Sequence, residues 1–238
     1  MTGAAEPPSA RAVADRPVSA VVFDLDGLLV DSEPIWREVE IDEFAAIGVR
    51  LDEHDVRQTM GMRLPEAIDH WRVRFPWTGP EPAEVESRIS TRVANLVATG
   101  GRPMPGALDA VARCTRWGLP VGVCSGSSQP VMAAALGRLG LESQVAVWHS
   151  AESEPYGKPH PACYLTTAAA LGVDPAECLA VEDSFNGAIA AKAARMRVVV
   201  VPEAGTRDSP RWGFCDARLD SLEAFDDELL RGLRTSVW

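Results

Sequence analysis

The chain has 238 residues, of which 46% are hydrophobic and 24% charged, and its 34 acidic and 23 basic side chains give a net charge of −11. This length suits one large domain or a core with a smaller companion, and the hydrophobic content excludes a wholly disordered chain. Because no cluster of lysine and arginine offsets the negative charge, we expect neither a nucleic acid nor a membrane as partner.

The ends of the chain and its cysteines indicate a cytoplasmic protein. Residues 1–17 are rich in Ala and Pro and lack the apolar segment of a signal peptide, so we expect a flexible tail there. The longest uncharged window, 117–137, has polar residues and Pro130 in its middle, which excludes a membrane helix. The cysteines form no CxxC pair and predict reduced core residues at Cys114, Cys124, Cys163, Cys178 and Cys215.

Five short runs rich in β-branched residues predict strands that are buried on both faces of a parallel sheet. They span Ala20–Phe23, Val121–Cys124, Val145–Trp148, Leu179–Glu182 and Val198–Val201. Between the last four lie helical patterns, one with Met132, Ala135, Leu136 and Leu139 before Gly140, the other from Pro161 to Leu171 before Gly172. This alternation predicts an α/β fold, a Rossmann-like three-layer sandwich around a parallel sheet.

The connection after the first strand is longer than the others and contains no strand pattern. Apolar residues recur there at helical spacing, as in Ile68, Trp71 and Phe75, and in Val85, Ile89, Val93, Leu96 and Val97. We therefore predict an inserted all-helical cap at residues 35–101, with hinges near Asp31–Pro34 and Thr99–Pro105, where Gly and Pro cluster. The α/β core then comprises residues 18–34 and 102–238, with a helix at Ala107–Trp117.

Two of the predicted strands are followed by pairs of carboxylates. Asp24 and Asp26 come at the end of the first strand, and Glu182 and Asp183 at the end of the fourth, at the sheet edge where open α/β folds bind ligands. Each pair has a simpler explanation as well, since Asp24-Leu25-Asp26-Gly27 also suits a turn and Asp183 or Ser184 suits a helix N-cap.

The second and third strands are followed by groups that suit an anion. Ser125 and Gly126 precede a predicted helix whose free N–H groups attract negative charge, although a serine-rich stretch is also an ordinary N-cap. Lys158 lies between a glycine and a proline, where it can neutralise a phosphate or remain a solvated loop lysine. All four groups follow successive strands of one sheet, so together they predict a carboxylate cluster able to hold one Mg²⁺ opposite a hydroxyl, a lysine and helix N–H groups.

These stretches resemble the four motifs of the haloacid dehalogenase superfamily, in the order typical of members with a helical cap after the first motif. The matching stretches are residues 24–33, 125–127, 157–161 and 182–187, and the match runs over nearly the whole chain from Val18. Residues 61–63, 71, 75–80 and 192–197 are more narrowly similar to a helical-capped phosphatase subfamily, the bacterial hexitol phosphatases, also described as 2-deoxyglucose-6-phosphatases.

The resemblance implies an enzyme that hydrolyses small sugar or polyol phosphate monoesters with Mg²⁺. It makes Asp24 the nucleophile that forms an aspartyl phosphate, and Asp26 the general acid and base. Asp24, the main-chain carbonyl of Asp26 and Asp183 would hold the metal together with Glu182, either directly or through another ligand. Ser125, Gly126 and Lys158 would bind the phosphate oxygens. We expect a monomer.

Residues of the cap separate related activities. A dehalogenase does not need Asp26 or Asp183, and a phosphonatase needs a cap lysine, whereas residues 35–101 contain no lysine. A β-phosphoglucomutase-like phosphosugar mutase is the nearest alternative, but it uses a cap lysine and a histidine where Trp36 stands here. A non-catalytic binding module is the third possibility, and such modules usually lose the nucleophile.

The cap residues also suggest what contacts the sugar. We hypothesise that Arg63, with Met62, reaches the sugar hydroxyls and that Trp36 or Trp71 forms part of the pocket wall. Both tryptophans lie on apolar helical stripes, so packing in the core of the cap is the alternative for each.

Overall fold

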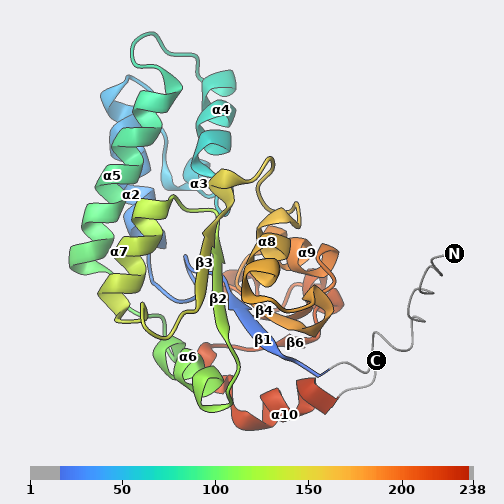
Figure 1. Cartoon of the computed structure of the whole chain (residues 1–238). Coiled ribbons are helices and arrows are strands. Elements are labelled where there is room, and N and C mark those ends of the chain that lie inside the picture. The colour runs from blue at the N-terminus through green and yellow to red at the C-terminus, as the bar shows by residue number, and fades with distance from the viewer. Residues whose placement is uncertain (1–16, 236–238) are drawn as a thin grey trace, which may run out of the picture.

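The computed structural model of the chain describes residues 17–235 (Figure 1). Residues 1–16, which make up most of the expected tail, lie outside the described part. Within it, six parallel strands form one sheet in the order β3-β2-β1-β4-β5-β6. The strands are β1 (Ala20–Phe23), β2 (Val121–Ser125), β3 (Val147–Ser150), β4 (Cys178–Glu182), β5 (Arg197–Val200) and β6 (Ala217–Arg218).

Helices cover both faces of the sheet, as the alternation of strands and helices predicts. One face carries α6 (Ala107–Arg116), α7 (Gln129–Leu139) and α10 (Asp227–Thr235), and the other carries α8 (Ala162–Leu171) and α9 (Phe185–Ala193). Successive strand residues point to opposite faces, so Phe23 packs with the first group of helices and Val22 with the second. The Rossmann-like three-layer sandwich is therefore confirmed.

Four of the helices between β1 and β2 form a separate layer above the sheet edge (Figure 1). They are α2 (Glu33–Ala46), α3 (Glu53–Val56), α4 (Leu64–Arg74) and α5 (Pro82–Gly100). Phe44, Trp71 and Ile89 are buried among them, and α5 also packs along α7 of the core. Trp71 is fully buried and stacks on Phe75 with ring centroids 6.1 Å apart, so it belongs to the core of the cap and not to a pocket wall.

Short 3-10 helices connect several of these elements. They span Ala151–Ser153, Pro175–Glu177, Ala204–Thr206, Pro210–Phe214 and Leu222–Ala224. All five cysteines are free thiols, and four of them are buried, as expected for reduced core residues. No helix within residues 17–235 is both long and apolar enough to cross a bilayer.

The strand order reverses between β1 and β4. From β1 the chain continues on one side through β2 and β3, and on the other side the sheet continues through β4, β5 and β6. Ligands of open α/β sheets bind outside the carboxyl ends of the strands at such a reversal. Asp24 directly follows β1 and Asp183 directly follows β4, so the topology brings both residues to this point.

Two strands differ from the sequence prediction by more than one residue at either end. β3 begins at Val147 and not at Val145, because the amides of Gln144 and Val145 bond back to the carbonyl of Leu141 in a turn after α7. The two-residue strand β6 was not predicted, since Ala217 and Arg218 show no β-branched or alternating pattern; it pairs with Val199 and Val200 at the sheet edge.

Two glycines that flank α6 provide a matched test of packing. Gly106 has φ +80° and a Cβ there would collide with the backbone of Leu222 and Glu223, whereas Gly118 has φ +67° and open space around it. We expect Gly118→Ala to cost about 1 kcal/mol for the left-handed backbone alone, and Gly106→Ala at least about 3 kcal/mol because the backbones must separate. Urea unfolding measures both, and equal losses would contradict the close approach.

Candidate active site

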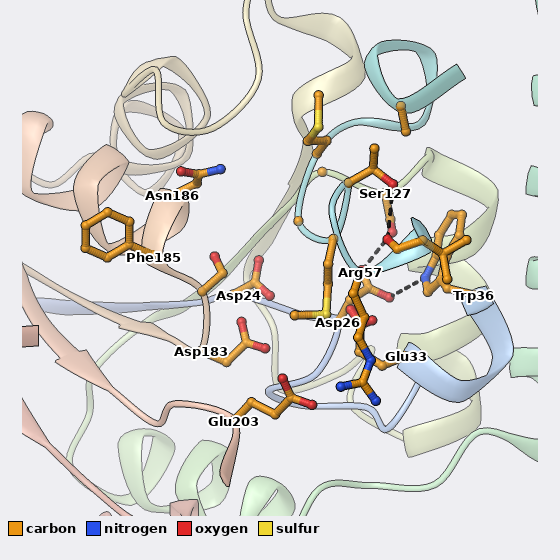
Figure 2. Close-up of a pocket in the computed structure, with 18 of the residues that line it drawn as sticks. Asp24, Asp26, Glu33, Trp36, Arg57, Ser127, Asp183, Phe185, Asn186 and Glu203 are labelled. Carbon is orange, nitrogen blue, oxygen red and sulfur yellow. Dashed lines mark hydrogen bonds between the residues drawn. The ribbon is translucent and has the colours of Figure 1, made fainter. Parts of the chain in front are cut away.

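A cavity of about 350 Å³ lies where the strand ends of the core face the cap (Figure 2). Its core side is formed by the segments that follow β1, β2, β4 and β5, and its cap side by α2 and the segment from α3 to the start of α4. Five catalytic, metal-binding or phosphate-binding residues predicted from sequence line it, namely Asp24, Asp26, Ser125, Gly126 and Asp183.

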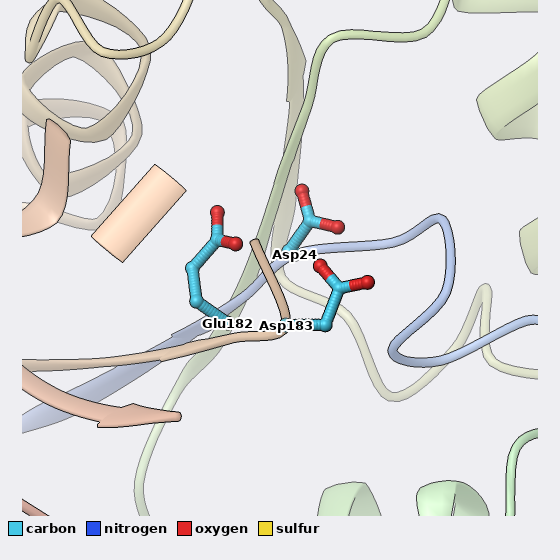
Figure 3. A group of neighbouring side chains, drawn as sticks. All are labelled: Asp24, Glu182 and Asp183. Atoms are coloured by element: carbon cyan, nitrogen blue, oxygen red, sulfur yellow. The ribbon is translucent and has the colours of Figure 1, made fainter. Parts of the chain in front are cut away.

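Three carboxyl groups meet on the core side of the cavity (Figure 3). Asp24, Glu182 and Asp183 each offer an oxygen atom, and these oxygens lie within 4.8 Å of one another. Asp24 and Asp183 line the cavity, while Glu182 is fully buried behind them. Oxygen donors in this number are the ligand type that Mg²⁺ prefers, so the cluster fits a hard divalent cation.

Lys158 supplies the positive charge that the structure places in this cluster. Its ammonium lies 2.5 Å from Asp24 Oδ1 and 2.6 Å from Glu182 Oε1, and it also donates to the main-chain carbonyl of Cys124 at 3.2 Å. Both side chains of the Lys158–Glu182 pair are buried. The lysine is therefore neither a solvated loop residue nor free to move, because three acceptors hold it beside Asp24.

Glu182 is saturated by donors of the protein. Its Oε1 accepts from Lys158 and from the Tyr164 hydroxyl, the latter at 2.6 Å, and its Oε2 accepts from the amide and hydroxyl of Ser184 at 3.1 and 2.9 Å. A carboxylate with both oxygens so engaged is poorly available to a cation. The contacts indicate that Glu182 orients Lys158, whereas Asp24 and Asp183 face the cavity.

Burial and mutual repulsion disturb the titration of this cluster. Burial raises the pKa of the Asp24 carboxyl to about 8 against the opposing effect of Lys158. Burial, followed by the neighbouring Asp24 and Glu182 carboxyls, raises the pKa of Asp183 well above its usual range. Burial alone would lower the pKa of the Lys158 ammonium, but Asp24 and Glu182 outweigh it and hold that pKa high. The site thus has an excess of acidic groups that further positive charge would relieve.

Asp26 points away from this cluster and into a set of hydrogen-bond donors (Figure 2). Its Oδ1 accepts from Ser32 Oγ at 2.6 Å and from Trp36 Nε1 at 3.1 Å, and its Oδ2 accepts from Ser125 Oγ at 2.9 Å and Ser127 Oγ at 2.7 Å. Ser125 and Ser127 come from the core, whereas Trp36 lies on α2. The second carboxyl of the motif is therefore held jointly by the core and the first helix of the cap.

The loop after β2 leads into the N-terminus of α7, which begins at Gln129. Gly126 lines the cavity there, and a Cβ at this position would contact nothing closer than the Met62 carbonyl at 3.9 Å. The Ser127 amide donates to Ser125 Oγ at 3.0 Å, and the Ser127 carbonyl accepts from Ser150 Oγ at 2.6 Å, which fixes the loop. Free space next to an ordered loop and a helix N-terminus suits an anion.

Arg63, which was expected to contact the sugar hydroxyls, is engaged between the cap and the core. Its guanidinium bonds to Glu66 at 2.5 Å and to the carbonyls of Ala151 and Glu154 at 3.1 and 2.8 Å, and it does not line the cavity. The residue lies at the start of α4. Glu66, one turn later, and the core loop after β3 provide the hydrogen-bond partners of its guanidinium. Arg63 thus joins cap and core, and its neighbours Met62 and Leu64 line the cavity instead.

Several residues of the site were not predicted. Ser32 binds Asp26, Tyr164 binds Glu182, and Arg57 and Glu40 line the cap side of the cavity. Trp36 lines the cavity, as hypothesised for the pocket wall, but its hydrogen bond to Asp26 was not expected. Trp36 lies on α2, ten residues after Asp26. The path of the chain after β1 brings its indole back to the Asp26 carboxyl. The sequence carries no signal for Tyr164, which lies within an apolar helix.

Comparisons with known proteins agree with this geometry. The family of haloacid dehalogenase-like hydrolases matches residues 18–195. Hexitol phosphatase B of Escherichia coli (strain K12) is 43% identical over 208 residues, which cover 87% of this chain and 94% of that protein.

Solved structures show the same fold. CbbY from Rhodobacter sphaeroides in complex with phosphate has a TM-score of 0.81 at 27% identity and covers 87% of this chain and 96% of its own. β-Phosphoglucomutase from Clostridium difficile has a TM-score of 0.79 at 20% identity, over 91% of this chain and 97% of its own.

The buried ion pairs of Lys158 generate a stability prediction. Lys158→Met removes the charge but keeps most of the volume, and leaves Asp24 and Glu182 buried without their cation, so we expect a loss of about 3 kcal/mol or more. Lys192→Met is the matched control, because the Lys192–Asp216 pair is partly exposed and is worth about 1 kcal/mol at most. Urea unfolding at neutral pH measures both, and a Lys158→Met variant as stable as the control would contradict this account.

Proposed function

The chain belongs to the haloacid dehalogenase-like hydrolase family, and we propose that it is a phosphatase that hydrolyses phosphate monoesters of small sugars or polyols. The observation that carries the proposal is the separation of two carboxyls at one cavity, with Asp24 beside Lys158 and Asp26 held by four donors. A hexitol 6-phosphate or 2-deoxyglucose 6-phosphate is the type of substrate favoured by the similarity to hexitol phosphatase B.

Asp24 is the proposed nucleophile. One of its oxygens forms a bond to the substrate phosphorus, the bond from phosphorus to the ester oxygen breaks, and an aspartyl phosphate and the alcohol result. Lys158 fixes Oδ1 of Asp24 at 2.5 Å. Together with a bound cation it would offset the burial that raises the pKa of Asp24, and so favour the ionised carboxylate, which needs no base. Water then attacks this aspartyl phosphate and releases inorganic phosphate and free Asp24.

Asp26 is the proposed general acid and base. As an acid it gives its proton to the departing alkoxide, and as a base it accepts a proton from the attacking water. Four hydrogen bonds keep its carboxyl at the cavity wall. One of the four donors, Trp36, belongs to the cap. Because Trp36 lies on α2, closing of the cap over the substrate would alter the orientation of this carboxyl.

A magnesium ion fits the donor set that the chain presents. Asp24 and Asp183, with the main-chain carbonyl of Asp26, would hold it, while Glu182 keeps its bonds to Lys158 and Tyr164. When bound, Mg²⁺ supplies positive charge that offsets the repulsion between Asp24 and an anionic phosphate. The excess of buried carboxyls over the one ammonium supports this requirement.

The phosphate oxygens would be bound by groups on the core side. Ser125, the amides around Gly126 and the N-terminus of α7 face the cavity, and Lys158 lies behind Asp24. These groups stay in place on the rigid sheet edge, so charge that develops on the transferring phosphoryl group meets oriented donors. We expect such an enzyme to act in the cytoplasm as a monomer on small phosphorylated molecules.

Water is a better acceptor here than a second sugar phosphate. The cap contains no lysine to bind the second phosphate of a bisphosphate, and an indole N–H donates to Asp26 where an imidazole would stand in a phosphosugar mutase. The mutase alternative predicts interconversion of hexose 1- and 6-phosphates. A non-catalytic module would have no use for the intact arrangement of Asp24, Asp26 and Lys158.

The nucleophile gives the most direct test of this function. We expect the wild-type protein with Mg²⁺ to release phosphate from a panel of sugar and polyol 6-phosphates, and Asp24→Asn to lower kcat by about 10⁴-fold or more, because the amide oxygen is a poor nucleophile. Released phosphate measures both. Hydrolysis retained by Asp24→Asn would contradict the covalent route, and sugar phosphate isomers without free phosphate would favour the mutase.

Cation binding is testable without turnover. We expect Mg²⁺ to raise the melting temperature of the wild-type protein, since a ligand that binds only the folded state stabilises it, and EDTA to reverse the shift. Asp183→Asn should abolish the shift because it removes a proposed ligand at the cavity. Asp69→Asn, an exposed substitution on α4, serves as the control and should keep it. An equal shift in both variants would contradict the assigned ligands.

A further inference from the structure

We propose that Glu40 of α2 recognises a hydroxyl group of the substrate and selects polyol phosphates over phosphate esters without hydroxyls. The proposal rests on the proposed phosphatase function and names the residue that determines its substrate class. Glu40 lines the cavity on the cap side. It lies one helical turn after Trp36, the residue whose indole binds Asp26, and therefore on the same face of α2.

The surroundings of Glu40 make it unusual. The neighbouring cap residues that line the cavity include the apolar side chains Val56, Leu64 and Ala67. Glu40 Oε2 is buried, and it has no hydrogen-bond partner among residues 17–235. A carboxyl oxygen that is removed from water without a partner costs free energy, and native proteins seldom keep one without a use.

The electrostatic surroundings of Glu40 also disfavour its ionised form. Burial, followed by the nearby Glu33 carboxyl, raises the pKa of Glu40 to about 8. No cation lies within ion-pair distance of it among the described residues. The group is thus available both to donate a hydrogen bond in its protonated form and to accept one, which matches a hydroxyl better than a second anion.

The position of Glu40 relative to the chemistry explains what it would contact. The phosphate-binding groups and the carboxyl cluster lie on the core side of the cavity, and Glu40 lies on the cap side. A substrate whose phosphate is bound at Asp24 therefore extends its carbon chain toward α2. There the apolar residues contact the carbon atoms, and the Glu40 carboxyl bonds to a hydroxyl.

Two substrates separate recognition of the hydroxyls from the chemistry. Sorbitol 6-phosphate carries hydroxyls along its chain, whereas p-nitrophenyl phosphate carries none. We expect Glu40→Leu to lower kcat/KM for sorbitol 6-phosphate about tenfold or more, because the lost hydrogen bond involves a buried carboxyl, and to leave p-nitrophenyl phosphate within about twofold. Glu40→Gln keeps a donor and an acceptor, so it should retain most of the activity on sorbitol 6-phosphate.

The controls keep the result interpretable. Glu40→Met is a second apolar variant with a longer chain and must behave as Glu40→Leu does, while Glu38→Gln removes an exposed carboxylate from the same helix and should change neither substrate. Without substrate, Glu40→Leu and Glu40→Met should melt at or above the wild-type temperature, since an unpaired buried carboxyl is lost.

Equal losses for both substrates, or no loss for sorbitol 6-phosphate, would overturn the role of Glu40. Failure of the wild-type protein to hydrolyse either substrate would instead overturn the proposed phosphatase function. A decrease in melting temperature together with unchanged selectivity would show that Glu40 serves the fold alone.

Discussion

The burial of acidic groups around a single ammonium at the ends of β1 and β4 is the constraint on which the rest of the site depends. Charged groups removed from water are tolerated only when they are paired and hydrogen-bonded. Lys158 satisfies Asp24 and Glu182 together, and Tyr164 and Ser184 complete the bonds of Glu182. Space is equally tight, since a Cβ on Gly187 would collide with the Glu182 carboxyl. Of the three clustered carboxyls, Asp24 and Asp183 remain open to the cavity.

The cap is joined to this rigid edge by a small number of polar contacts. Trp36 donates to Asp26, Ser90 bonds to Ser128 at 2.6 Å, and Arg63 reaches the loop after β3. The apolar packing of α5 along α7 adds a broader contact. A cap that moved as one body about the segments that join it to the core would change several of these contacts at once. The orientation of Asp26 would therefore depend on the position of the cap.

The sequence was informative where function needs ordered motifs at strand ends. Asp24, Asp26 and Asp183 follow buried strands, and Lys158 follows the partly exposed edge strand β3. The parallel sheet, with its order reversal between β1 and β4, brings these residues together. It was uninformative where contacts join distant segments. Tertiary packing determines the hydrogen bonds of Tyr164 to Glu182 and of Trp36 to Asp26. The guanidinium of Arg63 bonds to Glu66 and to two main-chain carbonyls, and no local sequence pattern predicts these partners. The edge strand β6 was missed for the same reason, because two residues carry no periodicity.

A net charge of −11 is compatible with an anionic substrate, because the electrostatic potential at the site depends on nearby groups and not on the charge of the whole chain. Lys158 and the N-terminus of α7 provide positive potential on the core side, and carboxyls that repel a phosphate on their own are the groups that attract a divalent cation. The acidic residues on the cap side of the cavity differ from this carboxyl cluster in their surroundings. Under our proposal, the Glu40 carboxyl, whose Oε2 has no hydrogen-bond partner among residues 17–235, would disfavour a second phosphate and favour a neutral hydroxyl. In these proposals the same residue type supports chemistry at the sheet edge and selectivity in the cap, and its burial and the neighbouring charges determine which of the two roles it has.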